Sequence, residues 1–259
     1  MATYWQSRMA KAQDVISQKN RKQVERILRK QYRQAAESIM DDFEATYLKL
    51  LSTIEAGKEP TPADLYKLDK YWQMQVQVDK KLKELNERQT RQLTRAFRKN
   101  FIDVYDSMAI QGLEAYSTID DDAITQLINQ IWCADGKSWS QRIWENTSLL
   151  KQTLNEELVS CVITGKPPSY LKKLLQGRFN VSYSRADALV RTELAHVQTQ
   201  AAQQRYKDYG IQQVEVLADK DERRCDVCGK LHGKRYNIND VMPVPAHPRC
   251  RCCMIPVIE

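Results

Sequence analysis

The chain has 259 residues, of which 42% are hydrophobic and 28% are charged, and its formal net charge at pH 7 is +7. This composition lets it bury one large core or two smaller ones, which excludes an intrinsically disordered chain. No stretch approaches the roughly 20 apolar residues that a bilayer-spanning helix needs, and the N-terminus lacks the apolar run of a secretion signal. The sequence therefore predicts a protein made in the cytoplasm without a membrane segment, and its charge favours an acidic partner.

The first half of the sequence predicts long helices because few residues can interrupt them. Up to residue 164 the prolines are Pro60 and Pro62, and the glycines are Gly57, Gly112 and Gly136. From Leu28 onward the apolar residues recur every three or four positions, which is the period of one helix face. These residues are Tyr32, Ala35, Ile39, Phe43, Tyr47, Leu50 and Ile54. Gly57 and the two prolines end this first helix.

A second long helix is predicted to start at the "TPAD" segment. Thr61 can cap the free amides, Pro62 suits the first helical position, and Asp64 complements the helix dipole. A second apolar stripe then runs from Val78 to Met108, toward Gly112. Two helices of nearly fifty residues would form an N-terminal helical hairpin or arm over residues 1–118.

Each helix of the predicted arm also carries a basic stripe, which falls within a narrow arc at 100° per residue. The two stripes consist of Lys22, Arg26, Arg29 and Arg33, and of Arg88, Arg91, Arg95 and Arg98. Such stripes can lie along a phosphate backbone, which makes double-stranded DNA a candidate partner. The alternative is a solvated face whose charges pair with nearby Glu and Asp.

The second half predicts shorter helices and then a small α+β module. Helices are expected near residues 120–133, 138–163 and 168–177, with Trp132, Trp139 and Trp144 as packing residues. A further helix is predicted to start at a Ser184 cap and to stop at Gly210. Alternation around Val214 and the terminal "CMIPVIE" predict two short strands. The fold class is therefore mainly α, with segments 1–118, 119–182 and 183–259.

Five of the seven cysteines lie within the last 35 positions, where they favour a metal site over disulfides in a cytoplasmic product. In "CDVC" the spacing of Cys225 and Cys228 suits a tight turn that aims two thiolates at one ion, and Gly229 leaves room for amides near the sulfurs. The "HPRCRC" segment offers the other half of a site. In the final strand, alternation would point Cys250 and Cys252 to one face and Cys253 to the core on the other.

This leaves five candidate ligands for a site that normally takes four. Cys225, Cys228 and Cys250 are the first choices, and His247 and Cys252 compete for the fourth place. A complete ligand set indicates a structural ion, with zinc as the first choice, that would pin this cysteine-rich knuckle (residues 225–252). The alternative is a reduced or disulfide-bonded cluster beside which His247 merely packs. His232 could substitute as a ligand, but a turn role suits it better.

Several segments together resemble the phage Mu F-like head morphogenesis proteins, which are minor capsid components of tailed double-stranded DNA phages. The matching residues are "RTE" at Arg191 to Glu193, the Tyr209-Gly210 helix end, Asp221 before "RRCDVC", the "LHGK" turn and the closing "HPRCRC". Upstream, "GKSWSQRIWEN" and "ITGKPPS" are also similar, so the resemblance covers about residues 130–256. The N-terminal arm matches only as a generic helical region.

The resemblance implies a minor head protein of the virion, located in the capsid interior or near the portal. Its implied partners are the portal protein, the scaffold or the major capsid protein, together with packaged DNA. No catalytic residue is expected. The rival hypotheses are a DNA-binding module, a nuclease using His232 or His196 beside Asp219 or Asp221, and a transferase using Glu193. Because Arg191, Thr192 and Glu193 are consecutive in a helix, they should diverge. Arg191 and Glu193 should tie that helix to the following strand and the knuckle, with Asp221 as a candidate partner.

Overall fold

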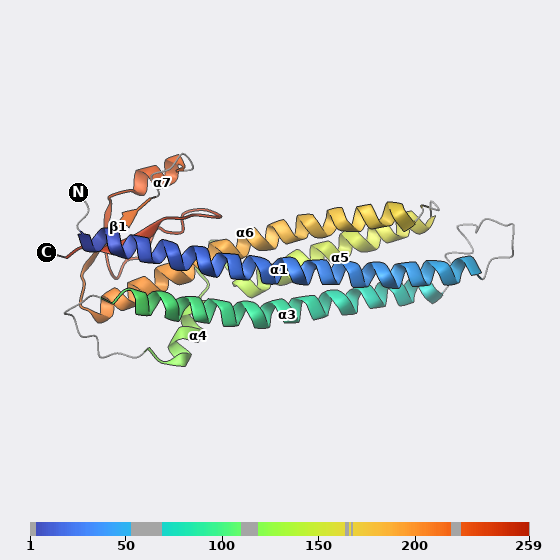
Figure 1. The fold of residues 1–259 in the computed structure, drawn as a ribbon, viewed down its shortest axis with the longest axis horizontal. Coiled ribbons are helices and arrows are strands. Elements are labelled where there is room, and N and C mark those ends of the chain that lie inside the picture. The colour runs from blue at the N-terminus through green and yellow to red at the C-terminus, as the bar shows by residue number, and fades with distance from the viewer. Residues whose placement is uncertain are drawn as a thin grey trace. The chain divides into compact units, whose positions relative to one another are not determined.

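The computed structural model describes residues 4–52, 69–109, 119–163, 166, 168–218 and 224–258. Its helices are α1 (Tyr4–Ser52), α3 (Asp69–Ser107), α4 (Asp121–Asn129), α5 (Trp139–Ile163), α6 (Pro168–Asp208) and α7 (Asp226–Leu231). Its strands are β1 (Gln213–Leu217), β2 (Arg235–Asn237) and β3 (Cys253–Pro256), and Figure 1 shows the order of these elements. The predicted class, mainly α with a small C-terminal sheet among clustered cysteines, is confirmed.

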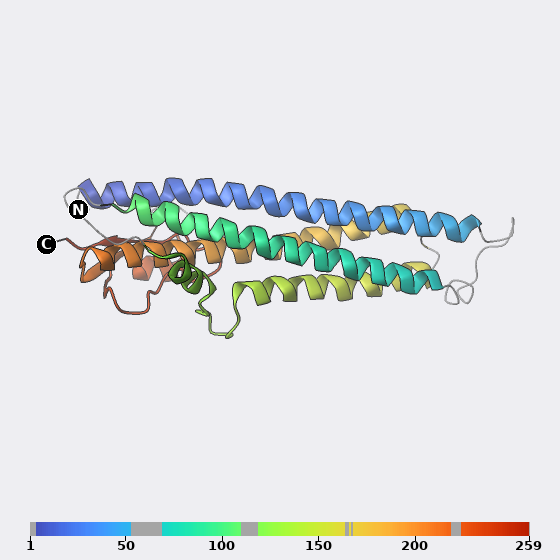
Figure 2. The same cartoon turned by 90° about the horizontal axis from the view of Figure 1, so that it is seen from below.

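The two long helices expected in the first half are present as α1 and α3, each unbroken in both views (Figures 1 and 2). Four residues of the predicted stripe, Leu28, Tyr32, Ile39 and Phe43, are buried at no more than 3% exposure. The predicted helix end at Gly57, the "TPAD" start and the end at Gly112 lie outside the described residues. None of the described helices has an apolar stretch long enough to cross a membrane.

The predicted break before Ser184 is wrong, because α6 runs without interruption from Pro168 to Asp208. Residues 178–183 contain neither proline nor glycine, and Phe179 and Ser182 are buried on one face of the helix. Tertiary packing therefore continues the helix where the capping pattern predicted a new start. The predicted stop is confirmed: Gly210 has φ +70°, and the amide of Ile211 donates to the carbonyl of Tyr206 at 3.0 Å.

The described residues form two compact units, neither of which is continuous in sequence. The first unit takes residues 1–25, 92–139 and 188–259, and the second takes 26–91 and 140–187. Helices α1, α3 and α6 each contribute to both units. The division into segments 1–118, 119–182 and 183–259 describes order along the chain and stays a prediction.

The second unit is entirely helical and has polar contacts inside its core. The Asn146 amide donates to the Tyr32 hydroxyl at 3.0 Å and to the Ser182 carbonyl at 2.9 Å, which links α5 to α1 and α6. The same unit also contains fully buried leucines from all three helices: Leu28, Leu154, Leu158 and Leu171. Burial raises the pKa of the Tyr32 phenol.

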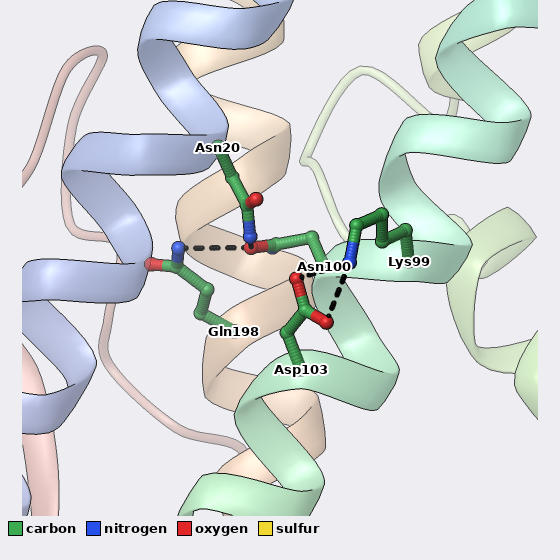
Figure 3. A network of polar contacts seen from close by, with 5 residues as sticks. All are labelled: Asn20, Lys99, Asn100, Asp103 and Gln198. Atoms are coloured by element: carbon green, nitrogen blue, oxygen red, sulfur yellow. Dashed lines mark hydrogen bonds and ion pairs between the residues drawn. The ribbon is translucent and has the colours of Figure 1, made fainter.

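The first unit joins the beginning of α1, the end of α3 and the second half of α6. Figure 3 shows three amides from these helices pointing toward one another. The side-chain oxygen of Asn100 accepts from the Asn20 amide at 2.6 Å and from the Gln198 amide at 3.2 Å. Asn20 and Asn100 are buried, so this network fixes the register of the three helices.

A three-stranded antiparallel sheet with the order β2-β1-β3 completes the first unit. Val214 faces Tyr236 on one side, and Val216 faces Met254 on the other. Both valines are fully buried, as their alternation predicted. The Gln13 amide donates to the Met254 carbonyl at 3.1 Å, so β3 lies against the start of α1, as both views show (Figures 1 and 2). Strand β2 was not predicted from the sequence.

Candidate metal centre

The "CDVC" segment forms the first turn of the short helix α7. Cys225 is its N-cap residue, and its sulfur accepts a hydrogen bond from the amide of Cys228 at 3.4 Å. This cap places both thiols on the same side of the turn. The amide of Gly229 donates to the carbonyl of Cys225 at 2.9 Å, and the room that Gly229 was predicted to leave for amides near the sulfurs stays a prediction.

The second half of the cluster lies on the segment that leads into β3. The amide of Cys250 donates to the His247 carbonyl at 3.1 Å, which closes a tight turn. Within this turn Arg249 has φ +63°, and its amide donates to the Thr192 hydroxyl of α6 at 3.1 Å. The turn therefore sets His247 and Cys250 together and anchors both to α6.

The structure brings the five predicted ligands together around Cys228. Its Sγ lies 3.0 Å from His247 Nε2 and 3.8 Å from Cys250 Sγ, while Cys225 Sγ lies 3.3 Å from the same His247 nitrogen. Two groups share Cys228: Cys225, Cys228 and His247, and Cys228, Cys250 and Cys252. Within each group the ligand atoms lie within 4.8 Å of one another.

This donor set fits a tetrahedral ion. A metal–sulfur distance of about 2.3 Å in a tetrahedron places two sulfurs about 3.8 Å apart, which matches the Cys228–Cys250 separation. His247 Nδ1 lies 2.9 Å from the Pro248 carbonyl, and donating to it would leave the Nε2 lone pair free for a metal. Thiolate and imidazole ligands in this arrangement are typical of zinc.

The thiols differ in how easily they lose a proton. The amide of Cys228 lowers the pKa of the Cys225 thiol, whereas burial raises that of Cys228 to about 12. A hydrogen bond from Cys252 lowers the pKa of Cys250 to about 5, and the same bond raises that of Cys252. The protein alone thus stabilises some of these thiolates but not all of them, and a bound cation would supply the missing stabilisation.

Two neighbouring residues lie outside these groups. Cys253, predicted to pack in the core, begins β3 and is only half-buried, while Cys252 is the more buried of the two. That prediction is wrong because β3 begins at Cys253, so Cys250 and Cys252 precede the strand and the alternation assumed for them does not apply. His232 follows α7, and its Nδ1 accepts from the Ala218 amide at 3.2 Å, which is the turn role predicted for it.

The consecutive residues Arg191, Thr192 and Glu193 point in three directions, as predicted. Arg191 pairs with Glu25 of α1 at 3.5 Å, and Glu193 accepts from the Trp132 indole at 2.9 Å. The contact with the knuckle comes from Thr192, through its bond with Arg249. The prediction that Arg191 and Glu193 tie α6 to the following strand and the knuckle stays a prediction, and its suggested partner Asp221 lies outside the described residues.

The two predicted basic stripes are at the surface. All their members are exposed except Arg98, which is half-buried and pairs with Asp121. Arg33 pairs with Glu37 at 3.6 Å and Arg91 with Glu87 at 3.9 Å. At least three of the eight cations thus have acidic partners, as expected of a solvated face.

The residues of the nuclease hypothesis do not gather in the part of the chain that the structure describes. His196 is buried beneath Trp132, with ring centroids 4.3 Å apart and planes 11° apart. Burial lowers the pKa of His196 to about 4, which suits a packing residue. Asp219 and Asp221 lie outside the described residues, and neither histidine belongs to a described group of potential metal ligands.

A comparison with protein families gives one match: residues 152–255 match the family described as Phage Mu protein F like protein. This range contains α6, strands β1 and β2, most of β3 and all five candidate ligands, and it lies within the region where the motifs resembled that family. Helices α1 and α3 lie outside it. The search of curated proteins and the search of solved structures found no match.

Proposed function

Because residues 152–255 match the phage Mu F-like family, we propose that the chain is a minor head protein of a tailed double-stranded DNA phage. In this role it acts in head morphogenesis, near the portal, and has no catalytic activity. Its partners are the portal protein, the scaffold or the major capsid protein. Assembly brings it into the virion, with a further part in packaging or delivery of the DNA.

One observation carries this proposal: the residues that match the family include the whole cluster of candidate metal ligands. The family match ends at residue 255, and within it the knuckle gathers four cysteines and a histidine around Cys228. The cluster is held by the Cys225 cap and by the Thr192–Arg249 bond. Such a closed set leaves no coordination position for water, so we assign the ion a structural role and zinc as its identity.

Elemental analysis of freshly purified, reduced protein tests the metal assignment. We expect about one zinc per chain in the wild type and a loss of stoichiometric zinc in Cys228→Ser, because Cys228 belongs to both ligand groups. Cys253→Ser is the matched control, since Cys253 is a neighbouring cysteine outside both groups, and it should keep its zinc. A wild type without stoichiometric metal would contradict the assignment.

The place of the chain in phage particles tests the head assignment separately. Mass spectrometry of purified proheads and mature heads should find the chain at a few copies per particle, and cross-linking should join it to the portal, scaffold or shell. A chain that is absent from proheads and mature heads alike would refute the head role, whatever its metal content. The two experiments can therefore fail independently.

Contact with packaged DNA is a second candidate function, favoured by the exposure of the basic stripes. Arg88 and Arg95 are exposed, and neither forms an ion pair with another residue of the described segments. If they contact phosphates, Arg88→Gln with Arg95→Gln should weaken retention of duplex DNA and flatten its dependence on salt. Exposed lysines of α6, changed as Lys172→Gln with Lys173→Gln, are the control for net charge. Retention that is equal in both variants would show that the stripes are merely solvated.

A further inference from the structure

A groove of about 480 Å³ lies within the first compact unit, beside the knuckle. Its walls come from the beginning of α1, the middle of α6 and the segment 247–254. Four arginines line it: Arg21, Arg191, Arg249 and Arg251. Among the described residues, Asp14 is the one carboxylate in the lining, and it accepts a hydrogen bond from Gln18 at 2.8 Å.

The lining of the groove contains more basic than acidic side chains. The Arg191 guanidinium pairs with Glu25 at 3.5 Å, and both side chains of that pair are about 30% exposed. Even with this pair and Asp14 counted as neutral, the lining keeps an excess of positive charge.

Arg249 occupies a backbone conformation that arginine rarely adopts. Its φ of +63° lies in the left-handed region, which costs a residue with a Cβ roughly 1 kcal/mol and favours Gly or Asn. The turn holds it there through the bonds from its own amide to Thr192 and from Cys250 to His247. Strain that is held in place by surrounding contacts is typical of functional positions, and Arg249 is one of the residues that line the groove.

We propose that this groove is a binding site for a phosphate group. Guanidinium groups pair with phosphate oxygens in a bidentate geometry, and several arginines from separate elements can surround one such anion. The volume is that of a small-ligand site, whereas an intact DNA duplex is too wide to enter it. The phosphate therefore belongs to a small phosphorylated molecule or to a single nucleic-acid strand.

This site is separate from the contacts proposed above for DNA. None of the eight residues of the basic stripes lines the groove. Its arginines are instead Arg21 of α1, which precedes the stripe, Arg191 of α6, and Arg249 and Arg251 of the knuckle. The inference also stands apart from the head assignment, since a phosphate site can be measured on the isolated chain.

Isothermal titration of the full, metal-loaded chain with inorganic pyrophosphate at low ionic strength tests the proposal. The test variant combines Arg249→Asn, which suits the left-handed backbone, with Arg251→Gln. The control combines Lys207→Gln with Lys234→Gln, which are exposed in the same unit and remove the same charge. Losing two charge-assisted contacts should weaken binding at least about tenfold, and the control should change it less than about twofold. Arg21→Gln, on α1, should also weaken binding and does not touch the knuckle.

A short single-stranded oligonucleotide and its duplex identify the source of the phosphate. Competition between the single strand and pyrophosphate would assign the site to a nucleic-acid strand, and binding of pyrophosphate alone would assign it to a small molecule. Both outcomes support the site. No binding of either probe, or equal weakening in the test and control variants, would overturn it. If the duplex binds as tightly as the single strand, and the control variant loses as much affinity as the test variant, then the binding is general charge attraction and the site is refuted.

Discussion

The hydroxyl of Thr192 in α6 accepts a hydrogen bond from the backbone amide of Arg249 in the knuckle, at 3.1 Å. The two residues are far apart in sequence, yet this bond fixes the turn that carries His247 and Cys250. Thr192 also donates to the carbonyl of Ala188 one turn earlier, at 2.8 Å, which holds its hydroxyl in the required rotamer. One side chain thus connects the longest described helix of the family region to the candidate metal centre.

Replacing Thr192 with Val keeps the shape of the side chain and removes the hydroxyl. The Arg249 amide would lose its acceptor, and we expect the free energy of unfolding to fall by about 1 kcal/mol, because the site is partly exposed. Hydrogen exchange at residues 247–252 should accelerate more than in α3. Thr153→Val is the control, since its hydroxyl bonds only within α5 and it lies at the surface. Equal effects of the two variants would show that the bond does not anchor the knuckle.

Removing the metal should loosen the knuckle and leave the long helices intact. We expect chelation of the wild type to raise amide exchange at residues 226–231 and 246–252, because these segments carry the candidate ligands. Exchange in α1 and α3 should not change, since their cores contain no ligand. Knuckle protection that survives full removal of the metal would contradict a structural role for the ion.

The Asn20–Asn100–Gln198 network should show strong coupling between its members. Asn100→Leu would leave the Asn20 amide buried without its acceptor, at a cost of about 2–3 kcal/mol in the free energy of unfolding. Adding Asn20→Leu should cost little more, because the orphaned donor is then gone, and a double-mutant cycle measures this difference. The exposed Lys99–Asp103 pair in Figure 3 is the control, with Lys99→Gln expected to cost less than about 0.5 kcal/mol. Additive effects of the two Asn changes would contradict the network.

His196 should make the protein less stable in acid. Burial lowers its pKa to about 4 from the ordinary 6.5, so the unfolded chain binds the proton more readily than the folded protein. Stability should therefore fall as the pH drops below 6.5, by about 3 kcal/mol in all when the folded-state pKa is passed. His196→Phe keeps an aromatic ring against Trp132 and should remove this part of the pH dependence, as denaturant titrations from pH 7 to 4 would show. If His196→Phe loses stability in acid as the wild type does, then His196 is not the source of the acid sensitivity.

The helical part of the fold follows from the sequence because its signals are local and repeated. The stripe through Leu28, Tyr32 and Ile39 spans many turns, so its period is unambiguous. The boundary within α6 was missed because Ser184 and Asp187 imitate a cap, whereas the buried face around Phe179 continues the helix. Strand β2 is too short to show a period, and it forms by pairing with β1.

The ligands of the candidate metal centre could be predicted from the sequence, but the groove beside them could not. The spacing of Cys225 and Cys228 and the close set of His247, Cys250 and Cys252 identify potential ligands without a structure. The phosphate groove was not predicted, because its arginines come from three elements that only the tertiary fold brings together. The positive φ of Arg249 has no signal in the sequence, since arginine is not a residue that favours it.

Strand β1 pairs with β2 on one side and with β3 on the other, and this arrangement bears on how an ion would be captured. Cys225 and Cys228 lie on the connection between β1 and β2, while His247, Cys250 and Cys252 lie on the connection between β2 and β3. Pairing of β1 with β2 and with β3 holds the ends of both connections together. Bringing the ligands together around an ion therefore costs less conformational entropy than it would in an open chain. Preorganisation of this kind should give fast and tight uptake, and a chain stripped of its ion should recover without refolding as a whole.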